Sequence, residues 1–250
     1  MYQDVMYSQE SLDLLRRFDP VALSPLSRDR NVYYFSKRLL DVTLAGLALI
    51  FLLPLMALVA GLIVLDTGTP FIFLQKRVGA RRWTRDGFSY WRQTTFTCYK
   101  FRTMLHNADP NLHQTFIKDY IEGRVQTSDA AGPKFKLPND PRITRVGRIL
   151  RKTSLDELPQ LVNVLKGDMS LVGPRPLPSY EVADYQASHR ERLAALPGIT
   201  GLWQVSGRCE VAFEEQVRMD IEYVRRQSLW LDLKILFLTV PAVLSGQGAE

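Results

Sequence analysis

The sequence predicts an α+β fold, that of a mostly helical monotopic membrane protein with a re-entrant membrane helix, interface helices and a small β-hairpin. Three observations support this prediction. An apolar block at 42–65 carries no charged residue, although the mean hydropathy of the chain is only −0.10. Two short runs rich in aromatic residues follow it and bracket a polar stretch. Later apolar residues recur at helical spacing.

Composition limits the classes of protein that fit. The 250 residues carry 32 Lys and Arg against 26 Asp and Glu, a formal net charge of +6. These values fit one ordinary domain and exclude wholesale disorder and a polytopic membrane protein. Two cysteines, Cys98 and Cys209, indicate a reducing compartment and do not support a zinc site. The sequence has no P-loop and no paired Gly-x-Gly-x-x-Gly, so an ATPase or a nicotinamide enzyme has no support.

We expect three regions: an N-terminal arm at 1–35, a membrane helix–break–helix at 36–69 and a main domain at 70–250. A helix over 42–65 would reach about 36 Å, enough to cross a bilayer of about 30 Å. Pro54 lies at its centre, where proline disrupts a helix. Basic residues flank the block on both sides, which the positive-inside rule permits if both ends are cytoplasmic. We therefore favour a re-entrant helix over a straight span or a buried soluble helix.

The main domain begins with a predicted hairpin of strands at 71–74 and 96–101, joined by a long loop at 79–95. A short helix is expected around 112–121. Asp140 and Pro141 resemble a helix start, and 153–167 has the pattern of an apolar helix closed by Gly167. Further helices are predicted at 211–226 and, lying at the membrane interface, at 229–244.

Asp156 and Glu157 form the most informative acidic pair, because they stand in a strongly basic neighbourhood. Carboxylates beside fixed positive charge stay ionised, which suits a nucleophile or a metal ligand. A structural explanation competes with this one, since Ser154 and Glu157 have the spacing of a capping box.

Basic side chains supply candidate anion sites. Arg175 lies between two prolines that stiffen its backbone, so its guanidinium could bind phosphate, although such a sequence is also common in surface turns. Lys100 and Arg102 are expected on one face of a strand, as a phosphate site or as a solvated basic face. Trp203 and Arg208 could contact a nucleotide, whereas core packing is the ordinary role of such a tryptophan. Together these features fit phosphoryl transfer between an anionic soluble donor and an anionic lipid, with Mg²⁺ held by carboxylates and phosphates.

The segment 139–176 resembles the signature of the bacterial sugar transferases, the monotopic phosphoglycosyl transferases that use polyprenyl phosphate. It contains the Asp156-Glu157 pair and ends in Gly-Pro-Arg-Pro. The resemblance extends in order over about 35–245. Supporting matches are Lys37-Arg38-x-x-Asp41, Gln75-x-Arg77-x-Gly79, Tyr99-Lys-Phe-Arg-Thr-Met104, Pro197-Gly-Ile-Thr-Gly201 and Asp232-Leu-Lys-Ile235.

The resemblance implies a reaction and roles for individual residues. Asp156 would attack the diphosphate of a UDP-sugar, release UMP and carry the sugar phosphate, which undecaprenyl phosphate would accept in a second, ping-pong step. Glu157 would help to bind Mg²⁺, and Lys100, Arg175 and Arg208 would lie near the donor. By the same resemblance, 70–250 is a catalytic domain at the cytoplasmic face of the bacterial inner membrane, in contact with anionic lipid, and Pro54 marks the membrane break.

The sequence departs from the family pattern in places. Leu53 precedes the break where small members commonly have serine, and the four-span N-terminal domain of the larger members is absent, which would fit a compact member or a catalytic fragment. We expect galactose or glucose as the sugar, in exopolysaccharide, O-antigen or capsule synthesis, and a homodimer is compatible with this class.

Two other functions would explain part of the sequence. A basic, membrane-anchored scaffold would explain the charge but not the acidic pair in this motif order. A nucleic-acid binder lacks any recognition module, so no nucleic-acid partner is expected.

Overall fold

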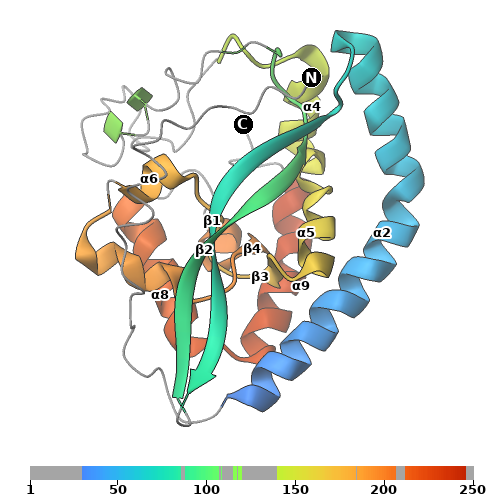
Figure 1. The fold of residues 1–250 in the computed structure, drawn as a ribbon. Coiled ribbons are helices and arrows are strands. Elements are labelled where there is room, and N and C mark those ends of the chain that lie inside the picture. The colour runs from blue at the N-terminus through green and yellow to red at the C-terminus, as the bar shows by residue number, and fades with distance from the viewer. Residues whose placement is uncertain are drawn as a thin grey trace.

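The computed structural model describes residues 30–85, 88–106, 108, 115–116, 118–119, 140–183, 185–206 and 212–245. Most of the expected N-terminal arm and Arg208 therefore lie outside the described residues. So does most of the expected helix at 112–121, whose four described residues are helical. The elements are α2 (Asn31–Thr67), β1 (Ile72–Arg85), β2 (Phe88–Phe101), α4 (Arg145–Thr153), η1 (Leu155–Glu157), α5 (Gln160–Lys166), β3 (Ser170–Val172), α6 (Ser179–Ala183), η2 (Ala187–Leu193), β4 (Gly198–Thr200), α7 (Leu202–Ser206), α8 (Phe213–Arg226) and α9 (Leu229–Ser245). The predicted α+β class is confirmed (Figure 1).

The apolar block forms most of α2, a helix of 37 residues. Within the described part of the chain it is the one helix long and apolar enough to cross a membrane, and only 11% of its most apolar window is buried. That exposure argues against the buried soluble helix weighed above, and fits a membrane anchor.

The interruption expected at Pro54 is absent, because α2 continues through this residue as a single helix. Proline removes one backbone hydrogen bond, while the neighbouring bonds maintain the helical path. Figure 1 shows α2 as one arched helix along the side of the molecule. The helix–break–helix expected at 36–69 is therefore corrected to a continuous helix, and its re-entrant course stays a prediction.

Lys37 fastens the first turns of α2 to the rest of the fold. Its ammonium group lies 3.0 Å from a carboxylate oxygen of Asp232 on α9 and donates to the Val172 carbonyl at 3.0 Å. It also donates to the Tyr223 hydroxyl at 3.3 Å, and Tyr223 donates to Asp232 at 2.7 Å. This buried ion pair joins α2 to β3, α8 and α9.

The next residues of the same helix face add two more contacts. Asp41 accepts hydrogen bonds from the Ser170 hydroxyl at 3.1 Å and from the Leu171 backbone N–H at 2.9 Å. Arg38 donates to carbonyl groups in the last turn of α5, where a cation complements the helix dipole. The inner face of α2 thus supports both β3 and α5.

The hairpin is far longer than predicted. β1 and β2 pair antiparallel from Ile72 opposite Phe101 to Arg85 opposite Phe88, so most of the loop predicted at 79–95 is paired strand. The prediction was wrong because the Arg-rich composition of this stretch suggested a loop, whereas a ribbon with open faces accepts polar side chains. Asp86 and Gly87 separate the two strands in sequence, and this dipeptide is a strong hairpin signal that we overlooked.

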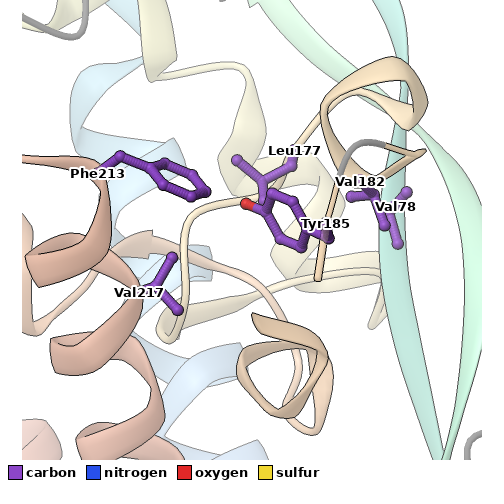
Figure 2. Packing of buried hydrophobic residues seen from close by; sticks show 6 residues of the cluster. All are labelled: Val78, Leu177, Val182, Tyr185, Phe213 and Val217. Atoms are coloured by element: carbon purple, nitrogen blue, oxygen red, sulfur yellow. The ribbon is translucent and has the colours of Figure 1, made fainter. Parts of the chain in front are cut away.

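A hydrophobic cluster packs the middle of the hairpin against the helices. The Val78 N–H donates to the Leu177 carbonyl at 2.8 Å, which fixes the segment before α6 to β1. Figure 2 shows the side chains that close this contact; they come from β1, α6, α8 and the segments around them. The cluster consists of Val78, Leu177, Val182, Tyr185, Phe213 and Val217.

The segment expected to begin a helix at Asp140 does so four residues later. Asp140 instead binds the side chain and backbone N–H of Arg142, and Thr144 is the N-cap of α4, accepting from Gly147 N–H at 2.9 Å. A Cβ at Gly147 would lie 2.1 Å from the Thr103 carbonyl oxygen, so glycine lets α4 approach the end of β2 closely.

The single helix expected over 153–167 is divided. The structure has η1, then Pro159, then α5, which ends at Gly167 as predicted. Pro159 is the N-cap of α5 and has no backbone N–H to continue the hydrogen bonds of the preceding turn, so it separates the two pieces.

The last two helices agree with their prediction. α8 buries Phe213, Val217 and Val224, and α9 carries exposed apolar residues beside its buried Asp232. The exposed residues on α9 include Trp230, Leu233, Phe237 and Val240. That stripe fits the interfacial position predicted for this helix.

We expect Lys37→Met to lower the melting temperature in detergent by about 6–12 °C. Removing one partner leaves the Asp232 carboxylate buried without its counter-ion, a loss of about 3 kcal/mol. Lys234→Met, on an exposed part of α9, is the matched control. Equal melting temperatures for the two variants, measured by differential scanning fluorimetry, would contradict the role given to Lys37.

Candidate active site

The acidic pair lies on a single turn between two helices. α4 ends at Thr153, Ser154 adopts a left-handed conformation with φ of 57°, and η1 then carries Asp156 and Glu157. The Ser154 side chain makes no capping hydrogen bond, so the capping box weighed from the sequence does not form. The Glu157 carboxylate is therefore not engaged in such a cap. Asp156 is largely buried, with 9% of its surface exposed.

Glu157 is bound by two cations from distant parts of the chain. Its Oε1 accepts from Lys100 Nζ at 2.6 Å and from Arg175 Nη2 at 3.0 Å. Lys100 Nζ also lies 3.9 Å from Asp156 Oδ2. The structure thus brings together four of the residues predicted for the site, Lys100, Asp156, Glu157 and Arg175, from β2, η1 and the loop after β3.

Arg102, the other basic residue predicted on this face, lies elsewhere. Its Nη2 donates to the Thr67 hydroxyl at 2.6 Å and to the Gly68 carbonyl at 2.7 Å, at the C-terminal end of α2. β2 ends at Phe101, so the alternation of side chains that placed Lys100 and Arg102 on one face stops before Arg102. Burial lowers the pKa of Arg102, and the nearby Asp66 opposes this shift. The prediction that Arg102 shares the phosphate-binding face with Lys100 is corrected accordingly.

Arg151, which is not among the residues predicted for the site, lies within electrostatic range of Asp156. Its Nε donates to the Thr103 hydroxyl at 3.1 Å. Burial lowers the pKa of this guanidinium, and the charge of Asp156 is the largest of the effects that oppose it. One signal was available: Gly147 and Arg151 are four residues apart in α4, so both meet Thr103 on the same face.

Arg77 links the hairpin to the loop of Arg175. Its Nη1 donates to the Pro176 carbonyl at 2.5 Å, while Nε and Nη2 donate to Gln75 Oε1 at 3.0 and 2.6 Å. Gln75 and Arg77 are alternate residues of β1 and so share one face with Cys98, the partner of Gln75 in β2. Burial raises the pKa of the Cys98 thiol, which therefore stays protonated.

The loop that carries Arg175 is fixed by the two parallel strands β3 and β4. Gly198 N–H donates to the Pro174 carbonyl at 2.8 Å, and Gly173 N–H donates to the Thr200 carbonyl at 2.9 Å. A Cβ on Gly198 would lie 2.1 Å from Gly173 N, so the backbones can approach this closely only because both residues are glycine. Arg175 is thus presented by a loop that is fixed at both ends.

Trp203, considered above for base stacking, is 3% exposed and belongs to the core. Core packing, its ordinary role, is the one that the structure supports.

A second cluster of buried charged residues lies near the site. Arg192 contacts Asp220 and donates to the Tyr185 hydroxyl at 2.6 Å, while Glu181 is buried near the charges of Arg77, Arg192 and Arg175. Burial raises the pKa of Glu181 to about 7, and that of Asp220 to about 6. In each case the arginine charges oppose the shift.

The raised pKa of Glu181 predicts a pH-dependent stability. The folded protein holds this proton and the unfolded chain releases it, so the free energy of unfolding falls as pH rises from about 4.5 to about 7. Glu181→Gln should remove this contribution and make the variant more stable than the parent at pH 8, by up to about 3 kcal/mol, but not at pH 4.5. Glu222→Gln, at a half-buried surface position on α8, is the control. Parallel stability curves for the parent and Glu181→Gln, from denaturant unfolding at several pH values, would refute the assignment.

The comparisons with known proteins identify the family of the chain. Residues 32–246 match the family model of the bacterial sugar transferases, and the chain belongs to this family. It is 43% identical over 223 residues to the exopolysaccharide production protein ExoY of Sinorhizobium fredii, covering 88% of this chain and 90% of that protein.

Two other relatives carry names that specify a reaction. The undecaprenyl-phosphate galactose phosphotransferase of Salmonella typhimurium is 46% identical over 86% of this chain and 42% of its own length. The undecaprenyl-phosphate glucose phosphotransferase of Komagataeibacter xylinus is 37% identical over 94% of this chain and 41% of its own. The chain therefore spans less than half of these longer proteins and most of the ExoY-type relative. It is a sugar transferase enzyme of the bacterial family.

Proposed function

We propose that the protein transfers a sugar-1-phosphate from UDP-galactose or UDP-glucose to undecaprenyl phosphate, giving a diphosphate-linked lipid and UMP. This step would start exopolysaccharide, O-antigen or capsule synthesis at the cytoplasmic face of the inner membrane. The observation that carries the proposal is the pairing of Asp156 and Glu157 with Lys100 and Arg175 in a domain fastened to an apolar helix. The names of the longer relatives support galactose or glucose.

The first chemical step would use Asp156 as the nucleophile. A carboxylate oxygen attacks the sugar-bearing phosphorus of the donor, the bond from that phosphorus to the bridging oxygen breaks, and UMP leaves with the electron pair. A sugar phosphate then remains on Asp156. Lys100, Arg151 and Arg175 would offset the charge of the phosphates, because phosphoryl transfer relies mainly on positioning and charge stabilisation.

The second step would transfer the sugar phosphate from Asp156 to the lipid. A phosphate oxygen of undecaprenyl phosphate attacks the same phosphorus, and the bond to the Asp156 oxygen breaks, which restores the carboxylate. The donor and the lipid would thus react with the same aspartate in turn, which is a ping-pong sequence. Because the acceptor is a lipid, the site would have to lie at the membrane surface. The arched α2 and the apolar stripe of α9 fit that location.

Glu157 would help to hold a Mg²⁺ ion together with the phosphates of the donor. Among the described residues no group of three or more His, Cys, Asp or Glu side chains could hold a metal ion. Mg²⁺ is commonly held by one or two carboxylates and substrate phosphates, and Glu157 would supply one such carboxylate. When bound, the ion would neutralise charge on the diphosphate.

We expect Asp156→Asn to lose UMP release by about 10³-fold or more, since the amide cannot act as the nucleophile. Reconstituted protein should be assayed against a panel of UDP-sugars, with Asp168→Asn, whose carboxylate lies 3.5 Å from Lys166, as the control. Without acceptor lipid, the parent should exchange labelled UMP into the UDP-sugar, and Asp156→Asn should not. Full activity of the variant, or no exchange by an active parent, would refute the covalent mechanism.

A metal titration tests Glu157. We expect EDTA to abolish activity and Glu157→Gln to raise the Mg²⁺ concentration for half-maximal activity by about tenfold or more, because one anionic ligand is lost. An unchanged Mg²⁺ requirement, measured at saturating donor, would exclude Glu157 as a ligand.

A further inference from the structure

The hairpin carries the chain's excess charge. Residues 72–101 contain seven basic residues and one acidic residue, a formal net charge of +6 that equals the net charge of all 250 residues. Three of these basic residues, Arg77, Lys100 and the neighbouring Lys76, belong to the half of the hairpin that contains the site. The other four are in the distal hairpin, defined here as 79–85 and 88–95, which lies outside the half that contains the site.

Two arginines of the distal hairpin face each other in an unfavourable arrangement. Arg81 lies directly opposite Arg92 in the strand register, and both are exposed. Like charges in this position destabilise a strand pair. Within the described residues neither arginine has a hydrogen-bonding or charged partner. The described part of the hairpin thus holds two adjacent, exposed guanidinium groups at a cost to strand pairing.

Aromatic rings lie next to this charge pair. Trp83 is 44% exposed, and its ring centroid lies 4.9 Å from that of Tyr90, its direct partner in the other strand. Trp and Tyr are the residues enriched where protein meets lipid headgroups.

The distal hairpin is fixed to the part of α2 where the apolar surface begins. Arg82 donates to the Asn31 side chain at 2.8 Å and lies over the Tyr34 ring at 4.1 Å, and Tyr34 packs edge-on against Trp91. On the same turns, Val32 and Phe35 are 81% and 73% exposed. Figure 1 shows the tip of the hairpin and the start of α2 at one end of the molecule.

We propose that the distal hairpin binds the headgroups of anionic phospholipids, through Arg81 and Arg92 with Trp83 beside them. The inference rests on the proposed membrane attachment of α2, because that attachment places the start of the helix at headgroup level. An acidic protein partner would meet the same charges, but the aromatic rings and the adjoining exposed apolar residues of α2 favour a lipid surface. The hairpin would then be a second membrane contact, which fixes the rotation of the domain about α2.

Hydrogen exchange of the full chain in nanodiscs tests the proposal. Discs of phosphatidylcholine alone are compared with discs that contain about one-third phosphatidylglycerol. We expect amides of 79–85 and 88–95 to exchange roughly fivefold or more slowly in the anionic discs, since each basic residue near such a surface contributes about a fivefold preference. High salt should remove the difference.

A double variant tests whether the lipid dependence comes from Arg81 and Arg92 or from the overall positive charge of the protein. Arg81→Gln with Arg92→Gln should abolish the lipid dependence, and Arg218→Gln with Arg226→Gln, two exposed arginines of α8, should retain it. Segment 42–65 should be protected in both kinds of disc. If it is, equal exchange of the distal hairpin in the two lipids overturns the proposal. If 42–65 is unprotected, the membrane attachment itself is wrong.

Discussion

The buried ion pair between Lys37 and Asp232 is the constraint on which the rest of the arrangement depends. An ion pair taken out of water is tolerated only where its remaining hydrogen bonds are satisfied. Here Tyr33 and Tyr223 donate to Asp232, and the Val172 carbonyl accepts from Lys37. These partners come from α2, α8, α9 and β3, so the pair forms only when all four elements are in place. The apolar helix is thereby part of the catalytic domain rather than an appended anchor.

Contacts of α2 and of the hairpin also position the residues of the candidate site. β3 ends in the loop that presents Arg175, and the contacts of Asp41 fix the start of β3 to α2. Arg77 holds the other side of that loop through the Pro176 carbonyl. Arg175 is therefore positioned by both the hairpin and α2, and Glu157 on its short turn is held by Lys100 and Arg175. Rigid neighbours of this kind are what phosphoryl transfer requires.

Much of this could be predicted from the sequence, and the failures have physical causes. Helices α2 and α8 follow from apolar runs and spacing, and the acidic pair follows from its basic surroundings. The length of the hairpin was underestimated because the polar side chains of an open two-stranded ribbon resemble those of a loop. Arg102 was misassigned because the direction of a side chain depends on where its strand ends, and composition does not specify that to one residue.

Arg102 closes the C-terminal end of α2 and stands two residues after Lys100 in the chain. The end of the membrane helix and the lysine of the active site are consequently held by one short stretch of backbone. A change in bilayer thickness acts on a membrane helix by tilting it or shifting its ends. Such a shift at the end of α2 would reach Lys100 through the hydrogen bonds of Arg102 and two peptide units. The end of the apolar helix is thus mechanically adjacent to the residues of the candidate site.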